Sequence, residues 1–336
     1  MTEELLSVED LHIKYRMEEN DIHAVSDVSF TIEENEYFGL VGESGSGKST
    51  IASAILGALD GNGEVTSGTI TYRGEDITHL SDSEFSSRFR WDNIATIPQA
   101  SMNSLDPVRR LSDQAIGITQ THTDWSKKQT LERLRDLFDV VGLAPERIND
   151  YPFQFSGGMQ QRAIIALSLL LDPDLLIADE PTTALDVILQ DQIMAHLNDL
   201  RDELDISVLF ITHDMAVILE NCDSLGVLHG GQLSEIGPTT EVFDNPGHPY
   251  SYLLQQAFPD YRYPDQELTI IEGQPPQLKS EVRQCTFAER CPWAAEECKM
   301  GAPPLETVDG DDAHKTSCIR TDEIDELRPE DPTKNV

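Results

Sequence analysis

Basic residues are scarce in this sequence, and the shortage limits the kinds of partner it can bind. The 336 residues include 24 Lys and Arg against 61 Asp and Glu, a formal net charge of -37. A surface that follows nucleic-acid phosphates needs clustered Lys and Arg, so the composition argues against a nucleic-acid partner. This exclusion is weaker in a halophile, where even nucleic-acid binders can be acidic overall.

The acidic residues are spread along the whole chain, from Glu3 and Glu4 to Asp331, and do not form one acidic tail. Such an excess of one charge makes a protein repel itself in dilute buffer, whereas molar salt screens the charges over a few ångströms. We therefore expect a halophilic host that accumulates salt.

The sequence also has no long hydrophobic run. The longest, at 163–171, is interrupted by Ser168 and falls far short of the roughly 20 residues that cross a bilayer. Residues 1–4 lack a positive region followed by an apolar stretch, so a signal peptide is not predicted. We expect a chain that stays in the cytoplasm and reaches a membrane only through partner chains.

Apolar residues nevertheless make up 39% of the chain, which is enough for a globular fold with a sizeable core. Alternating apolar and polar residues predict antiparallel strands with one wet face, at 6–13 and 24–32. Short apolar runs then predict buried strands of a mostly parallel sheet covered on both faces, at 37–41, 175–178 and 208–211. The fold class expected is therefore α/β.

Two other regions interrupt or follow this sheet. From about 100 to 172 the pattern is mostly helical, and one set of apolar residues has the spacing of a helix face: Leu131, Leu134, Leu137, Phe138 and Val141. We expect a helical insertion there, within a domain at 1–244. At 245–336 the composition shifts to Pro, acids and four cysteines, which predicts a separate C-terminal extension, loose from Thr321 onward.

The stretch after the first buried strand matches the phosphate-binding pattern G-x-x-x-x-G-K-[ST]. It consists of Gly42, Glu43, Ser44, Gly45, Ser46, Gly47, Lys48 and Ser49, with Thr50 next in a helix predicted at 49–59. Glycines let backbone N–H groups turn toward phosphates, and the helix N-terminus adds partial positive charge. Lys48 is suited to bind the β and γ phosphates of ATP, and the Ser49 hydroxyl to bind Mg²⁺. A flexible turn that merely precedes a lysine is the less specific alternative.

The predicted strand at 175–178 leads into two carboxylates, Asp179 and Glu180. Because the carboxyl ends of parallel strands meet at one edge of the sheet, both acids should lie beside the phosphate loop. Asp179 is suited to hold Mg²⁺, and Glu180 is placed to orient and deprotonate the water that attacks the γ phosphate. The alternative, an acidic strand end that only faces solvent, is weakened by the neighbouring phosphate loop.

Upstream of this strand, the segment FSGGMQQR at 155–162 resembles the signature sequence of ABC ATPases. On its own it is also an ordinary helix N-terminus with Ser as the cap. The resemblance implies an ABC-type nucleotide-binding domain with a parallel core sheet, an antiparallel β subdomain and a helical insertion. It also implies that Ser156, Gly157 and Gly158 act in trans, on the γ phosphate held by another subunit. Met159 departs from the Gln that is common in the family, but is similar to the form in peptide importers.

Four further residues stand where this family has functional ones. Gln99 resembles the glutamine that contacts Mg²⁺ or the attacking water, and Asp186 resembles a residue of the loop that crosses the dimer interface. His213 resembles the switch histidine that contacts the γ phosphate, and Tyr15 lies where an aromatic ring stacks on adenine. An isolated Gln, His or Tyr is more often structural, and it is their order along the chain that favours the functional interpretation.

Two segments outside the shared core make the chain similar to oligopeptide and dipeptide importers in particular. They are PQASMNSLDP at 98–107, with Asp106 where Asn is usual, and NPGHPYSYLL at 245–254, at the start of the extension. The resemblance implies an ATPase at the cytoplasmic face of the membrane, with two permease subunits, a paralogous second ATPase subunit and a solute-binding protein. Oligosaccharides or nickel as cargo, and a soluble ABC ATPase of DNA repair or translation, stay as alternatives.

Four of the five cysteines fall in the extension, with gaps of five, six and nineteen residues between Cys285, Cys291, Cys298 and Cys318. No pair has the tight C-x₂₋₄-C spacing of most structural zinc sites. The resemblance to peptide importers implies one metal centre, a [4Fe-4S] cluster, that would give cohesion to an extension with few aliphatic residues. A Cys₄ zinc site, ordinary thiols and two disulfides stay as alternatives. Cys222 stands apart, and we expect it to be a small buried hydrophobic residue.

Overall fold

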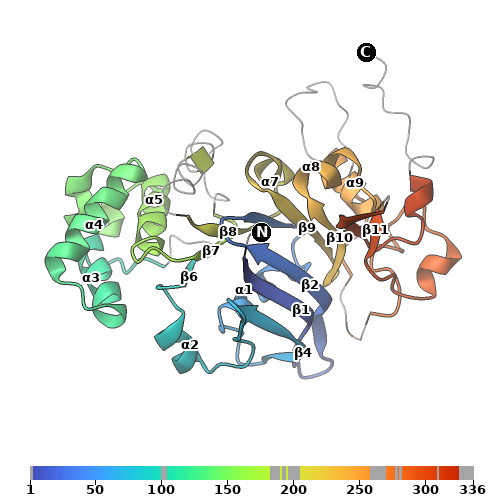
Figure 1. Ribbon diagram of the computed structural model, residues 1–336, viewed down its shortest axis with the longest axis horizontal. Helices are drawn as coiled ribbons and strands as arrows, with labels where there is room; N and C mark the ends of the chain where they lie inside the picture. Colours follow the sequence, from blue (N-terminus) through green and yellow to red (C-terminus); the bar gives the residue numbers. More distant parts are fainter. Residues whose placement is uncertain are drawn as a thin grey trace, which may run out of the picture.

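The computed structural model describes residues 3–99, 104–181, 190, 194–195, 205–257, 270–276, 279, 282–308 and 310–324. Two β-sheets form the centre of the molecule, with the helical insertion at one end and the C-terminal extension at the other (Figure 1). The described part of the chain holds no helix with the length and apolar character needed to span a bilayer.

The smaller sheet contains the antiparallel strands that the sequence predicts. Its order is β2-β1-β4-β5, with the bounds Ile22–Glu33, Glu4–Tyr15, Gly63–Tyr72 and Glu75–Asp76. One face of β1 and β2 is apolar, and paired residues such as Leu6 and Ile32 are fully buried. They share one hydrophobic core with Ile51 and Ile55 of helix α1 (Lys48–Ile55), which carries part of the phosphate loop.

The larger sheet has the order β11-β12-β10-β9-β3-β8-β7-β6 among the described strands, where β11 is Glu306–Val308, β12 is Asp311–Thr316 and β10 is Gln232–Pro238. Its parallel part is made of β6 Ile94–Ile97, β7 Leu175–Asp179, β8 Ser207–Thr212, β3 Tyr37–Val41 and β9 Ser224–His229. Every residue of β3 and β8 is buried, as expected for parallel strands covered on both faces. The predicted parallel sheet is confirmed.

Helices α1 and α2 are both short. Helix α1 spans Lys48–Ile55 and not the predicted 49–59. It ends early because Leu56 is followed by Gly57 at φ +59°, a left-handed backbone that stops a helix. Helix α2, Asp82–Arg88, begins at a capping box in which Ser81 and Glu84 bond each other's backbone N–H groups.

The helical insertion consists of α3 Leu111–His122, α4 Lys127–Val140, the 3-10 helices Pro145–Asn149 and Pro152–Gln154, and α5 Gly157–Ser168. Leu134, Leu137 and Phe138 of α4 are completely buried, which confirms the predicted helix face. Helix α5 returns the chain to the sheet, because the Ser168 hydroxyl donates to Thr96 O of β6 at 2.9 Å.

After the core strands, the chain forms α7 Met215–Asn221, β10 Gln232–Pro238, α8 Thr239–Asp244 and α9 Pro249–Gln256. The extension then adds the 3-10 helices Glu296–Lys299 and Thr321–Glu323 and the strands β11 Glu306–Val308 and β12 Asp311–Thr316. Cys222, just after α7, is 8% exposed and packs in the main core, which confirms its predicted burial.

The extension is joined to the nucleotide domain through the sheet itself, because β12 pairs antiparallel with β10. At this junction the fully buried Glu235 accepts hydrogen bonds from the N–H groups of Gly247 (2.6 Å) and His248 (3.0 Å). Its Oε1 also lies 2.7 Å from His314 Nε2 in β12. Hydrogen bonds from both sides make burial of this carboxylate tolerable, and they bind extension and core together. The boundary at 244–245 stays a prediction.

Candidate nucleotide-binding site

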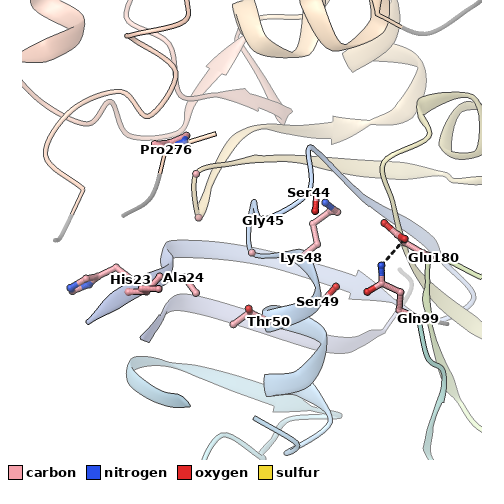
Figure 2. Close-up of a pocket in the computed structure, with 14 residues that line it drawn as sticks. His23, Ala24, Ser44, Gly45, Lys48, Ser49, Thr50, Gln99, Glu180 and Pro276 are labelled. Atoms are coloured by element: carbon pink, nitrogen blue, oxygen red, sulfur yellow. Dashed lines mark hydrogen bonds between the residues drawn. The ribbon is translucent and has the colours of Figure 1, made fainter. Parts of the chain in front are cut away.

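A pocket of about 310 Å³ opens at the carboxyl edge of the parallel strands, above the start of α1 (Figure 2). It is lined by two groups of residues. The predicted ones are Ser44, Gly45, Gly47, Lys48, Ser49, Thr50, Gln99 and Glu180. The others are Ile22, His23, Ala24, Gly230, Gly231 and Pro276, which come from β2, from the turn between β9 and β10, and from the extension.

Two glycines let the phosphate loop pass close to its neighbours. Gly47 has φ +109°, and a Cβ there would lie 2.5 Å from the carbonyl oxygen of Ala24. A Cβ on Gly42 would lie 2.1 Å from the carbonyl oxygen of Leu228. A side chain at either position would therefore push the loop away from β2 or β9.

Lys48 lies inside the loop and is 5% exposed. Its ammonium donates to Gly42 O at 2.7 Å, to Glu43 O at 2.9 Å and to Ser46 Oγ at 3.3 Å. Burial lowers the pKa of Lys48 to about 8, and the carboxylates of Glu180, Asp179 and Glu43 oppose this shift. The loop therefore holds a cation that a phosphate group would favour in its charged form.

Asp179 ends β7 near the Ser49 hydroxyl in the first turn of α1. Burial raises the pKa of this carboxyl group, and Glu180 adds to the increase. Its Oδ1 is buried and has no hydrogen-bond partner among the described residues. A carboxylate oxygen without a partner next to a hydroxyl is an arrangement that suits Mg²⁺, which binds hard oxygen ligands. Ser49 and Asp179 therefore fit the predicted metal site.

Glu180 is the point where three strand ends meet. Gln99, after β6, donates from Nε2 to Glu180 Oε2 at 2.7 Å, and His213, after β8, places Nδ1 3.1 Å from Oε1 (Figure 2 shows the first contact). The Glu180 side chain is 15% exposed, and its backbone has φ +49°, which is uncommon for a residue with a Cβ. The three predicted catalytic residues are thus brought together.

The signature residues lie elsewhere on the molecule. Ser156 caps α5 by accepting a hydrogen bond from Met159 N–H at 3.4 Å, and both Ser156 and Gly157 are exposed. None of the three predicted signature residues lines the described pocket of their own chain. Gln161, further along α5, donates to Pro181 O at 2.5 Å, which links this helix to the residue after Glu180. Asp186 lies outside the described residues.

Tyr15 contacts Thr50 but does not line the described pocket. Its hydroxyl donates to Thr50 Oγ1 at 3.4 Å, and its ring lies against Gly63. His23 and Ala24 of β2 line the pocket instead (Figure 2). Sequence reasoning missed these two residues, because a strand alternation does not tell which residues border a neighbouring pocket.

The four cysteines of the extension line one small cavity of about 20 Å³, together with His248, Phe287 and Trp293. Cys285 N–H donates to Cys298 O at 3.0 Å, so the chain folds back on itself here. None of the five cysteines forms a disulfide in the structure, which is against the disulfide alternative. Among the described residues no group of three or more His, Cys, Asp or Glu is arranged to hold a metal ion. The metal centre therefore stays a prediction.

Comparison with known proteins identifies the family of this chain. Residues 25–183 match the family model "ABC transporter", and residues 234–298 match "Oligopeptide/dipeptide transporter, C-terminal region". The oligopeptide transport ATP-binding protein OppD of Salmonella typhimurium is 42% identical over 304 residues, 90% of each chain. The dipeptide transport ATP-binding protein DppD of Caldanaerobacter subterraneus is 39% identical over 309 residues, 91% of this chain and 94% of that one.

Comparison with solved structures identifies the fold. The dimeric ATP-binding cassette MJ0796, in a post-hydrolysis state with ADP and Pi, aligns with a TM-score of 0.61 and 29% identity. The alignment covers 70% of this chain and 99% of that one. The predicted ABC-type fold is thereby confirmed, and the chain is an ABC ATPase. The chain belongs to the family of ATP-binding proteins of oligopeptide and dipeptide ABC transporters.

Proposed function

We propose that the chain hydrolyses ATP to power the import of di- or oligopeptides through partner permease subunits. The observation that carries the catalytic part is the meeting of Gln99, Glu180 and His213 next to the phosphate loop. The match of residues 234–298 to the C-terminal region of oligopeptide/dipeptide transporters supports the cargo class. It also favours transport over the soluble ABC ATPases of DNA repair or translation.

In this proposal Glu180 accepts the proton of the water that attacks the γ phosphate. Gln99 and His213 hold the two carboxylate oxygens in place, so that the base keeps one orientation. Lys48 and the backbone N–H groups of the loop bind the β and γ phosphates. Mg²⁺, when bound, neutralises phosphate charge, and Ser49, Asp179 and Gln99 are its proposed ligands.

We propose that the chain acts as one half of an ATPase dimer with a paralogous subunit. Ser156 and Gly157 are exposed and lie outside their own pocket, which is what a residue that acts in trans requires. An exposed helix N-terminus is suited to an anion, here the γ phosphate of the partner subunit. Asp186 is proposed to cross the same interface. Two permease subunits would anchor this dimer at the cytoplasmic face of the membrane, and a solute-binding protein would supply the cargo.

Reconstitution tests the cargo and the coupling together. The chain is purified with its permease and solute-binding chains, placed in proteoliposomes, and supplied with labelled peptides, an oligosaccharide or Ni²⁺. We expect ATP-dependent uptake of peptides that stops in the Glu180→Gln variant. Uptake of the oligosaccharide or of Ni²⁺, with no uptake of peptides, would show that the cargo is not a peptide. An active ATPase that assembles with no permease would favour the soluble class.

We further propose that Cys285, Cys291, Cys298 and Cys318 hold one [4Fe-4S] cluster. Their convergence on one cavity lined by aromatic rings supports a common ligand. A single zinc ion would need all four sulfurs about 2.3 Å from one centre, whereas in a cluster each thiolate binds its own iron. Anaerobic purification should give brown protein with iron and acid-labile sulfide, and Cys298→Ser should bleach it. Colourless protein with stoichiometric zinc, or metal-free protein with an ordered extension, would refute the cluster.

We also propose that the protein works in molar salt. The net charge of -37 supports this inference, because repulsion among so many carboxylates falls when ions screen them.

A further inference from the structure

One arginine of the extension reaches the phosphate loop. Arg290 donates from Nη1 to Glu43 Oε2 at 2.5 Å and from Nη2 to Glu43 Oε1 at 2.9 Å. The two side chains are 6% and 25% exposed, so the pair is largely removed from water. Such a two-pronged contact fixes the direction of both groups. The partners are 247 positions apart, and the contact exists only because the extension folds back on the nucleotide domain.

The Arg290 guanidinium is held from other sides as well. Its Nε donates to Glu272 O at 2.9 Å, and its Nη1 lies 3.1 Å from His229 Nε2. Burial and the nearby Arg290 lower the pKa of His229 to about 3, so the imidazole is neutral and Nε2 can accept this bond. The other ring nitrogen, Nδ1, lies 2.9 Å from the Thr286 hydroxyl. These contacts leave the arginine little freedom to leave Glu43.

Glu43 connects this arginine to the lysine that binds phosphate. Its backbone oxygen accepts a hydrogen bond from Lys48 Nζ at 2.9 Å, and its backbone N–H donates to Tyr250 Oη at 3.0 Å. Its carboxylate, like those of Glu180 and Asp179, raises the pKa of Lys48 and so opposes the effect of burial. The loop residues that line the pocket are Ser44, Gly45, Gly47, Lys48, Ser49 and Thr50, whereas the Glu43 side chain turns to Arg290.

We propose that Arg290 is a positioning residue for ATP binding. It cancels the charge of Glu43 and holds that carboxylate away from the phosphates. Without a partner, the carboxylate would lie at the base of a loop that receives several negative charges. In a partly buried site such a repulsion is only weakly screened, even at high salt. If Arg290 only tied the extension to the loop, the effect of its loss on ATP binding would not depend on the charge of Glu43.

A double-mutant cycle on the full-length chain separates these two roles. The dissociation constant of MgATP is measured in molar KCl for the wild type, Arg290→Gln, Glu43→Gln and the double variant. We expect roughly tenfold weaker binding by Arg290→Gln, because the loop then carries an unpaired charge. The double variant should bind MgATP more tightly than Arg290→Gln and within about twofold of Glu43→Gln, because no unpaired carboxylate then remains in the loop. Arg283→Gln is the matched control, since Arg283 is an exposed arginine of the same extension.

Kinetics of the assembled transporter give a second readout. Arg290→Gln should raise KM for ATP and leave kcat unchanged, because Gln99, Glu180 and His213 are untouched.

Wild-type affinity in Arg290→Gln would overturn the proposal, and so would a double variant that binds as weakly as Arg290→Gln. If Arg290→Gln does not fold, Arg290→Met, which also removes the charge, decides: about tenfold weaker binding supports the proposal, and wild-type affinity overturns it. A wild-type chain that binds no ATP would refute the ATPase function instead.

Discussion

Replacing Glu180 with Gln is the most direct test of the catalytic centre. The amide has almost the same shape, and its oxygen can still accept the hydrogen bond that Gln99 now donates to Oε2 at 2.7 Å. The variant should therefore keep the arrangement of the three strand ends. The amide cannot take a proton from the attacking water, however. Loss of a general base typically lowers the rate by two to four orders of magnitude, which raises the barrier by about 3 to 5 kcal/mol.

The assay measures ATP binding and turnover separately in the assembled transporter. Binding should persist, because Lys48 and the loop are unchanged and one negative charge near the phosphates is removed. Turnover should fall by about two to four orders of magnitude. Glu220→Gln, the same chemical change on an exposed position of α7, is the matched control and should leave both unaffected. Near-normal hydrolysis by Glu180→Gln would remove Glu180 from the role of base, and loss of binding would point to a structural role.

Three further predictions concern charge and assembly. Since burial lowers the pKa of Lys48 to about 8 and bound phosphate favours the ammonium, MgATP affinity should fall as pH rises above about 8. Lys48→Arg should remove this dependence and Lys48→Ala should weaken binding at every pH, whereas a flat wild-type profile contradicts the reasoning. The unfolding midpoint should rise from dilute buffer to molar KCl, and equal midpoints would refute salt adaptation. Purification from native membranes should recover permease chains and a second ATPase, and recovery of this chain alone would count against the complex.

The parts of the site that were predictable from the sequence are local in the chain. The loop from Gly42 to Ser49 and the pair Asp179 and Glu180 each follow a strand directly, so strand position and spacing place them. Gln99 and His213 are different, because a single Gln or His after a strand has no chemical signature of its own. Only the family resemblance singled them out, and the structure then places both against Glu180.

The parts that were not predictable depend on contacts across the chain. Tyr250, Pro276 and Arg290 all approach the phosphate loop or its pocket from beyond residue 245. The strands that attach the extension were also missed, since β11 and β12 are short, polar and without a clear alternation. Their place is decided by buried partners such as Glu235 and His314, which local propensity does not encode.

The contact between Arg290 and Glu43 has a consequence for the extension itself. Binding linkage is reciprocal: if the folded extension improves ATP affinity by some factor, bound ATP stabilises the folded extension by the same factor. A tenfold effect corresponds to about 1.4 kcal/mol, a substantial share of the stability of a small region with a thin core. The C-terminal extension is therefore better understood as a wall of the nucleotide site than as a domain added to it. A substitution that unfolds the extension around Arg290 should accordingly weaken ATP binding.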